Sequence, residues 1–316
     1  MKAFVLKLLV SLGLLAFFLS RIDFSQFVRV VASADLFYLG LILFAYAAGQ
    51  VVSCIRWIVL AYPLGFHFSF TEYLSFYFIG MFFNLFAPST IGGDASRVFY
   101  LTRGSKTGQQ TWGRQTTHAL VAVLTDRIVG MAVMVWVAAL ALVLFPQYPV
   151  PGVVRYVTFG LSLAFFASWF FLPLLNRMLR RLGYSAGEYL RLSLETYWGR
   201  QQIILNSILL SVIVHLNQGA LQFYLAKAVG LEIPWSYGFI LYPLVGIFSA
   251  LPISLNGIGL REGGYLFLLT QIGVSSEKAI AVGLLWFLVI VLDSLIGGVL
   301  YIARRGEAVS EDPARA

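Results

Sequence analysis

Charged residues are scarce in this chain of 316 residues. Lys, Arg, Asp and Glu make up 11% of it, whereas a soluble domain carries roughly a quarter. Hydrophobic residues make up 59%, and the mean hydropathy is +0.84. The apolar residues fall in long blocks from end to end, with no long polar stretch between them. Because a soluble protein would still need a polar surface, the composition predicts one polytopic membrane domain.

Residues that build covalent and metal sites are also scarce. Cys54 is the one cysteine, which excludes an internal disulfide and a cysteine-based zinc site. The three histidines have no metal-ligand spacing, and the sequence contains no Ser-His-Asp order, nucleophile elbow or P-loop. We therefore expect no catalytic residue, no metal and no cofactor.

The net charge of +8 comes largely from basic residues gathered in short loops. Residues 97–114 hold four basic side chains and no acid, and residues 176–200 hold five arginines. This clustering is what orientation in a membrane requires, so nucleic acid is not the expected partner. By the positive-inside rule both loops, and the tail after them, are predicted to be cytoplasmic.

Eight apolar segments follow one another along the chain. A membrane span needs about 20 helical residues, and the second, fourth, sixth and eighth segments are long enough. The first resembles a signal peptide, but a weak cleavage pattern and the following Arg21 favour an uncleaved span. The segments are residues 3–20, 36–60, 70–88, 117–145, 156–175, 202–226, 237–254 and 280–302.

The third and seventh segments end in helix breakers followed by charge. Both contain the pattern Pro-x4-Gly-x3-Arg, and the copies, starting at Pro88 and Pro252, are 164 residues apart. Three matched positions can arise by chance, but the half-chain offset favours an internal repeat. Broken helices at membrane depth are tolerated only where they are buried in protein or line a watery cavity. The predicted hairpin turns contain Pro88, Gly92, Gly93, Pro252, Gly257 and Gly259.

The loop charges fit the positive-inside rule only if these two segments enter and leave the membrane on one side. We therefore predict an all-α integral membrane protein with about six full spans and two re-entrant hairpins, arranged as an inverted-topology repeat. The repeats cover residues 1–150 and 151–304, and residues 305–316 form a polar cytoplasmic tail. Both termini are predicted on the cytoplasmic side of the inner membrane.

Polar side chains lie within or beside the apolar blocks, where each charge costs at least about 2.5–3.5 kcal/mol on insertion scales. Mutual neutralisation, of Asp94 by Arg97 and of Arg261 by Glu262, is one explanation. The other is ligand contact, because the guanidinium fork suits phosphate oxygens and helix starts favour anions. The candidate substrate-binding residues are Arg56, Asn84, Asp94, Arg97, Asp126, Arg127, Asn256, Arg261 and Glu262.

The order of these motifs resembles the lysylphosphatidylglycerol synthase transmembrane-region family, the flippase module of the multiple peptide resistance factor. The resemblance covers nearly the whole chain and implies a multi-pass, flippase-like fold. The full-length factor has a soluble domain that makes the aminoacyl lipid, and we expect neither that domain nor its lysyltransferase activity here. The positions that match the family pattern are Arg56, Asn84, Pro88, Gly92, Gly93, Asp94, Arg97, Asp126, Arg127, Gly257, Arg261 and Glu262.

Together these features predict transbilayer movement of an anionic lipid, or of a polyprenyl-phosphate-linked lipid, through an arginine-lined cavity. The alternatives are a membrane enzyme acting on such a lipid, with Asp94, Asp126 or Glu262 as acid or base, and an accessory subunit for a lipid-modifying enzyme. Membrane lipids are the expected ligands, and the sequence leaves their identity open.

The inverted topology predicts that residues 97–114 and residues 273–279 lie on opposite sides of the membrane. Single cysteines introduced in each loop and labelled from outside intact cells measure this directly. Labelling of both loops from the same side would exclude the arrangement.

Overall fold

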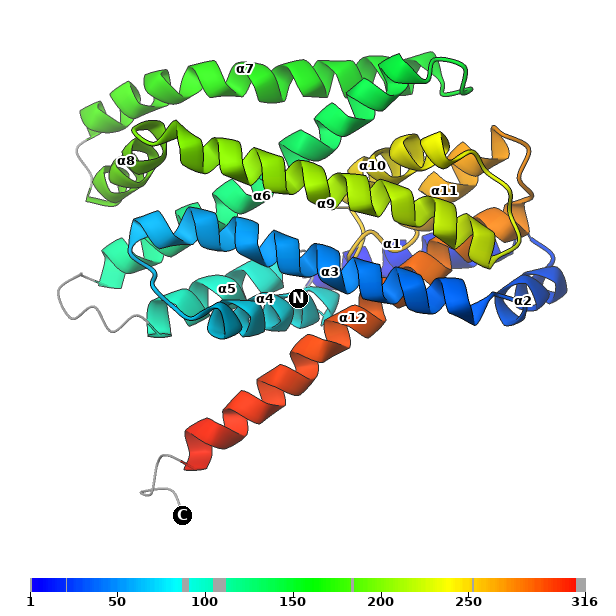
Figure 1. Ribbon diagram of the computed structural model, residues 1–316, viewed down its shortest axis with the longest axis horizontal. Helices are drawn as coiled ribbons and strands as arrows, with labels where there is room; N and C mark the ends of the chain where they lie inside the picture. The colour runs from blue at the N-terminus through cyan, green and yellow to red at the C-terminus, as the bar shows by residue number, and fades with distance from the viewer. Residues whose placement is uncertain are drawn as a thin grey trace.

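The structure, a computed structural model, describes residues 2–20, 22–86, 91–104, 112–182, 185–251 and 253–310, and the regular elements in these ranges are all helical (Figure 1). The 3-10 turns Tyr62–Leu64 and Trp235–Tyr237 accompany the α-helices. The α-helices are α1 (Lys2–Leu19), α2 (Phe24–Ala32), α3 (Leu36–Ala61), α4 (Phe70–Phe86), α5 (Ile91–Gly104), α6 (Trp112–Leu144), α7 (Gly152–Leu182), α8 (Ser185–Trp198), α9 (Gln201–Ala228), α10 (Gly238–Ser249), α11 (Leu260–Thr270) and α12 (Ser276–Ser310).

Among the described residues, four regions are long and apolar enough to cross a membrane, and they belong to α3, α6, α9 and α12. They coincide with the second, fourth, sixth and eighth apolar segments, so the prediction for these four is confirmed. Shorter apolar stretches lie in α1, in the first half of α7 and around α10. The spans are Leu36–Leu64, Gly113–Leu144, Gln201–Ala228 and Ser276–Arg304.

Several stretches that were expected to be loops contain helices instead. α2 lies within residues 21–35, α5 occupies the first part of 97–114, and α8 lies in 176–200. α12 also continues into the predicted tail, residues 305–316. Asp23 caps α2, because its carboxylate accepts hydrogen bonds from two backbone N–H groups of the first turn. These helices are short or polar, so a search for apolar blocks does not detect them.

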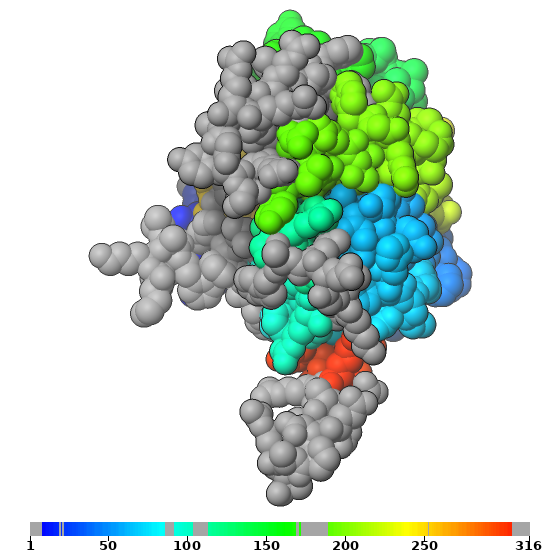
Figure 2. Space-filling view, turned by 90° about the vertical axis from the view of Figure 1, so that its left-hand side faces the viewer, coloured from blue at the N-terminus to red at the C-terminus, as the bar shows by residue number. Residues whose placement is uncertain are grey.

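The centre of the molecule is an antiparallel pair formed by α3 and α9. The two helices run in opposite directions across the molecule in Figure 1 and lie side by side at one end in Figure 2. Near one end of the pair, the backbone N–H of Asp35 donates to the carbonyl oxygen of Ala228 at 2.8 Å. Further along, Asn217 Nδ2 donates to the carbonyl oxygen of Ala45 at 2.9 Å. This hydrogen bond from the Asn217 side-chain amide joins two helices that are otherwise largely apolar.

α4 and α5 form the first helical hairpin. The ring of Phe76 stacks on that of Tyr100, with centroids 4.9 Å apart. Close to the turn, Asn84 Oδ1 accepts a hydrogen bond from the backbone N–H of Gly93 at 2.9 Å. Early residues of α4 thus meet late residues of α5, so the two helices are antiparallel. Pro88, predicted at the turn, lies outside the described residues.

Gly92 and Gly93 were expected in that turn, and the structure places them in the first helical turn of α5 instead. A Cβ atom on Gly93 would overlap the carbonyl oxygen of Gly80 on α4. The glycine is therefore needed for the close approach of two helices, not for a bend in the backbone.

α10 and α11 form the second hairpin, in which the rings of Phe248 and Phe267 meet edge to face. Gly257 and Gly259 lie in the connecting segment with φ of +74° and +82°, a conformation that favours glycine. Here the predicted glycines do form the turn, while Pro252 lies outside the described residues.

The helices of the two halves follow the same order. When 164 is added to the residue numbers that bound α3, the range becomes 200–225, which nearly coincides with α9 (Gln201–Ala228). Shifting those of α6 gives 276–308, and α12 is Ser276–Ser310. α1, α2, α4 and α5 shift in the same way onto the positions of α7, α8, α10 and α11.

Each hairpin packs on helices of both halves. α4 of the first hairpin packs on α12, and α10 of the second packs on α6. Gly297 allows the first contact, because an added Cβ would overlap the backbone of Phe78. Gly246 allows the second, where a Cβ would lie 2.7 Å from the sulfur of Met134. Because α5 also packs on α6 and α11 on α12, each hairpin joins its own half to the other.

Replacing Gly297 by valine is expected to lower the stability by about 1–3 kcal/mol, because the side chain would overpack the contact between α4 and α12. Gly40→Val is the matched control, since a Cβ there meets nothing within 4 Å. The unfolding temperature of each purified variant in detergent measures the difference. Equal temperatures for the two variants would contradict the packing described.

Candidate functional site

Asp126 of α6 lies between two arginines from other helices. Its Oδ1 accepts a hydrogen bond from Arg56 Nε on α3 at 2.7 Å, and its Oδ2 accepts one from Arg97 Nη2 on α5 at 2.8 Å. Arg56 also donates through Nη1 to Ser211 Oγ on α9 at 3.0 Å. The three charged side chains are buried, and together they carry one surplus positive charge.

Arg97 is also held by aromatic rings. Its guanidinium carbon lies 4.3 Å from the ring centroid of Trp57 and 5.0 Å from that of Tyr77. Such contacts stabilise a cation that has left water. A Cβ on Gly80 would lie 3.0 Å from Arg97 Cγ, so the glycine leaves room for this side chain.

Asp94 of α5 supplies the second carboxylate, and it pairs with Arg127 Nε on α6. Its other oxygen lies 3.8 Å from Arg97 Nη1. The expected neutralisation of Asp94 by Arg97 is thus present, but the Asp94–Arg127 pair is the closer one. Both carboxylates connect α5 to α6 and so fix the first hairpin in place.

Arg261 of α11 has a different environment. Glu262 accepts a hydrogen bond from the backbone N–H of Gly259 at 2.6 Å, and the part of the chain that the structure describes contains no ion pair between Arg261 and Glu262. The predicted pair is therefore wrong. Arg261 Nη2 donates to the carbonyl oxygen of Asn256 at 2.8 Å, and its guanidinium lies over the ring of Phe287. Its Nη1 is buried and has no hydrogen-bond partner among the described residues.

These groups border a cavity of about 370 Å³ that α3 to α6 and α9 to α12 enclose. Three of the candidate residues do not line the cavity but lie just behind its wall. Asp94 pairs with Arg127, and the carbonyl oxygen of Asn256 accepts a hydrogen bond from Arg261. Glu262 caps the start of α11. The cavity is within the size range of ligand sites. The candidate residues that line it are Arg56, Asn84, Arg97, Asp126, Arg127 and Arg261.

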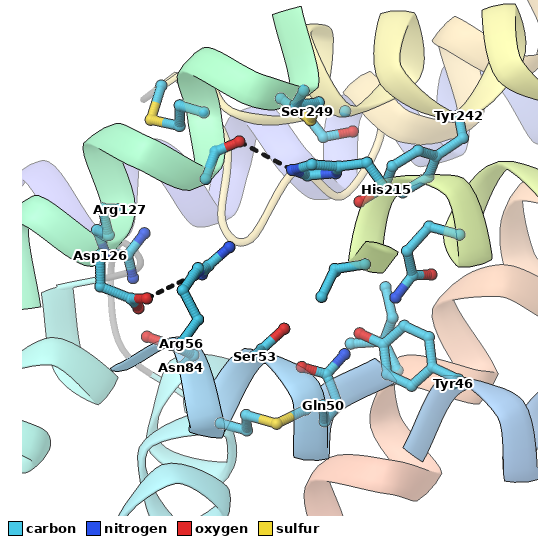
Figure 3. A pocket seen from close by; sticks show the side chains of 18 of the residues that line it. Tyr46, Gln50, Ser53, Arg56, Asn84, Asp126, Arg127, His215, Tyr242 and Ser249 are labelled. Carbon is cyan, nitrogen blue, oxygen red and sulfur yellow. Dashed lines mark hydrogen bonds and ion pairs between the residues drawn. The ribbon is translucent and has the colours of Figure 1, made fainter. Parts of the chain in front are cut away.

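The sequence analysis did not assign the neutral part of the wall. Gln50 and Ser53 of α3 face His215 of α9 across the cavity, beside the charged end (Figure 3), and Gln218 of α9 also lines it. The sequence did contain a pattern that indicates the α3 part of this wall. Gln50 and Ser53 precede Arg56 at intervals of three residues within an apolar block, which places the three side chains on one face of a helix.

Residues 4–297 match the lysylphosphatidylglycerol synthase TM region. The chain belongs to this family. The resemblance read from the motif order is confirmed, and membership makes the chain a multi-pass membrane protein linked to lipid handling. No curated protein matches the chain.

The side chains that line the cavity of this family member carry more positive than negative charge. Four arginines line it, and Asp126 is the one carboxylate among the described lining residues. No group of three His, Cys, Asp or Glu side chains in the described ranges could hold a metal ion. The wall is therefore suited to an anion that the arginines bind directly.

A second cavity, of about 1200 Å³, lies among α6, α7, α8 and α9. Its lining is mostly apolar, with Ile128, Val129 and Trp136 on the α6 side. Because Asp126 and Gly130 face the first cavity, α6 separates a polar space from an apolar one.

Replacing Asp126 by asparagine is expected to destabilise this family member by about 3–5 kcal/mol, because two buried arginines would lose their counter-charge. Glu195→Gln removes a carboxylate from the α8 pair with Arg191 and should cost about 0.3–0.5 kcal/mol. Protein yield and unfolding temperature in detergent compare the two. An Asp126 variant as stable as the Glu195 variant would argue against the bridge.

Proposed function

We infer that this protein moves an anionic lipid from one leaflet of the membrane to the other, with the headgroup passing through the arginine-lined cavity. The observation that carries this inference is the surplus of buried positive charge at the cavity wall. Four guanidinium groups line the cavity, whereas Asp126 in the wall and Asp94, which pairs with Arg127 behind it, supply two carboxylates; Arg261 has a buried N–H group without a partner among the described residues. A buried charge without a counter-charge is costly, so the surplus favours an anionic ligand.

Phosphate is the anion that these side chains suit best. Arginine stays protonated, and its planar fork can donate two parallel hydrogen bonds to phosphate oxygens. Membership of a lipid-handling family supports a lipid as the source of that phosphate.

An inverted-topology repeat supports movement across the membrane. α3 and α9 occupy equivalent places in the two halves, both are long enough to span, and they pack antiparallel. If both cross the membrane, they cross in opposite directions, which is the relation between inverted repeats. In such a repeat, Arg97 and Arg261 would lie on hairpins that approach the cavity from opposite faces.

The hairpins are short for full spans. α10 has 12 residues and α11 has 11, which correspond to about 18 Å and 16 Å at 1.5 Å per residue. The hydrocarbon core is about 30 Å thick. Re-entrant hairpins that reach the cavity and return fit these lengths, and the positive loops then keep both termini in the cytoplasm.

The apolar cavity beside α6 suits the hydrocarbon part of the same lipid. In this arrangement the headgroup contacts one face of α6 while the chains stay on the other, so neither part loses its preferred surroundings. The sequence contains no P-loop, and we expect movement to be passive or coupled to an ion gradient.

Replacing Arg261 by glutamine is expected to slow lipid movement about tenfold, because a charge-assisted hydrogen bond to phosphate is worth roughly 1.5–3 kcal/mol. Arg97→Gln should act in the same direction. The measurement uses proteoliposomes that contain a phospholipid with a fluorescent acyl chain, and it follows the rate at which external dithionite reduces the dye in the inner leaflet.

Lys227→Gln is the control for that assay, because this exposed lysine in the last turn of α9 lines neither cavity. Unchanged rates for both the Arg97 and Arg261 variants would exclude the cavity as the route. A chemically altered lipid, detected by mass spectrometry of the same vesicles, would instead support an enzyme.

A further inference from the structure

Asp293 of α12 is a buried carboxyl group that the site described above does not use. The described residues include three buried acids, Asp126, Glu262 and Asp293. Asp126 is held by two arginines, and Glu262 accepts a hydrogen bond from the backbone N–H of Gly259. Asp293 is 1% exposed, and neither of its oxygens has a hydrogen-bond partner among the described residues. Because a carboxyl group without partners inside a membrane span is costly, we expect it to have a function.

Asp293 lies next to the polar cavity, at the end where Arg261 is found. Trp286, Ile290 and Asp293 follow one another on α12 at intervals of four and three residues, so they share one face of the helix. The first two line the cavity, and so does Tyr46 of α3, whose ring packs edge to face on Trp286 (Figure 3). Among the ionisable groups around the Tyr46 hydroxyl, Asp293 has the strongest electrostatic effect, and Arg261 acts on it too. A charge on Asp293 is therefore felt at the cavity wall.

Other ionisable groups face this end from the helices around α12. α2 meets the start of α12, where the backbone N–H of Asp23 donates to Glu277, 16 residues before Asp293. α9 contributes His215 to the cavity wall. Tyrosine and arginine exchange protons only well above neutral pH, which leaves Asp293, Glu262 and His215 as the groups here that can do so near neutrality. The groups on the other helices are Tyr46 of α3, Tyr77 of α4, Tyr242 of α10, and Arg261, Glu262 and Tyr265 of α11.

Among the described residues, the charges around the cavity balance when Asp293 is counted. Four arginines line the cavity, and the carboxylates of Asp94, Asp126 and Glu262, in or just behind the wall, offset three of them. An ionised Asp293 offsets the fourth while the cavity holds no anion. When a phosphate enters, its negative charge takes over this role, and a second negative charge at Asp293 is then unfavourable in a surrounding of low polarity. Binding of a proton to Asp293 restores the balance.

A proton suits Asp293 better than a metal ion does. A hard cation such as Ca²⁺ takes about 6–8 oxygen ligands. No group of three His, Cys, Asp or Glu side chains in the described ranges could hold a metal ion, and Trp286 and Ile290, on the same face of α12, supply no oxygen. A proton needs one oxygen atom, which the carboxylate provides.

We propose that Asp293 binds a proton when an anionic lipid enters the cavity, and that the proton and the lipid cross the membrane together. The proton leaves the water on one side, forms an O–H bond with the carboxylate, and returns to the water on the other side. One lipid charge and one proton then move in each cycle, so no net charge crosses. By linkage, each of the two increases the affinity for the other. This coupling rests on the proposed transport of an anionic lipid, and it names the ion and the residue involved.

A pH gradient across proteoliposomes tests the coupling. Vesicles of phosphatidylcholine contain a trace of phosphatidylglycerol with a fluorescent acyl chain, the external pH is fixed, and the interior is either at the same pH or more alkaline. After equilibration, external dithionite measures the fraction of dye in the outer leaflet. Wild-type protein should distribute the lipid evenly at equal pH. For each unit of pH difference it should enrich the lipid about tenfold in the alkaline leaflet, because a proton ratio drives an equal lipid ratio. Protein-free vesicles give the background.

Three variants test the assigned residue. Asp293→Asn keeps the shape of the side chain but cannot take up the proton, so it should move the lipid and leave the leaflets even under the gradient, although His215 and Glu262 remain in place. Asp293→Glu retains a carboxyl group and should retain the enrichment. Glu232→Gln removes an exposed carboxyl group between α9 and α10 and should behave like the wild type. An enrichment that persists in Asp293→Asn would overturn the role of Asp293.

Proton uptake on binding separates this proposal from the transport on which it rests. Titration of the purified full chain in detergent with phosphatidylglycerol, in two buffers with different heats of ionisation, reports the protons taken up. Wild-type protein should take up protons, and Asp293→Asn should lose this uptake; equal uptake by both would overturn the site. Wild-type vesicles that move lipid but stay even under the gradient would overturn the coupling and leave the transport in place. Uptake that depends on Asp293 without any lipid movement would support the proton site and remove the proposed transport.

Discussion

The bridge of Asp126 between Arg56 and Arg97 is the interaction on which the polar interior depends. It joins α3, α5 and α6, and Arg56 extends the connection to α9 through Ser211. Without the carboxylate, two guanidinium groups would face each other in an apolar surrounding, at a cost far above that of any single apolar contact. The bridge also fixes where the first hairpin ends, because Arg97 is part of α5. The shape of the cavity is therefore set largely by one acid.

The two halves share a helix order but not a charge pattern. The positions 164 residues after Asp126 and Arg127 are Ile290 and Val291, so neither residue of the bridge recurs at the matching position of the second half. Arg261 rests instead on a backbone carbonyl and an aromatic ring. The strongly held arginines at one end and the loosely held one at the other give the cavity two unequal ends.

Much of the fold was predictable because it depends on composition. Long apolar blocks are a property of the chain itself, and Gly257 and Gly259 mark the turn of the second hairpin by local backbone chemistry. The partner of Asp126 was not predictable, because Arg56 is 70 residues away and meets it only through packing. The same holds for Gly93, whose role depends on Gly80 of another helix. Polar residues such as Gln50 and His215 were overlooked because no charge marked them.

The distance in sequence between Arg56 and Asp126 has a consequence for how the chain is made. During synthesis α3 is made before α6, so Arg56 has no counter-charge from Asp126 until the chain is 70 residues longer. Its insertion is unfavourable on its own and becomes favourable only when α6 arrives. We therefore expect α3 to remain near the insertion machinery until α6 follows, so that membrane entry and tertiary folding of the first half are coupled.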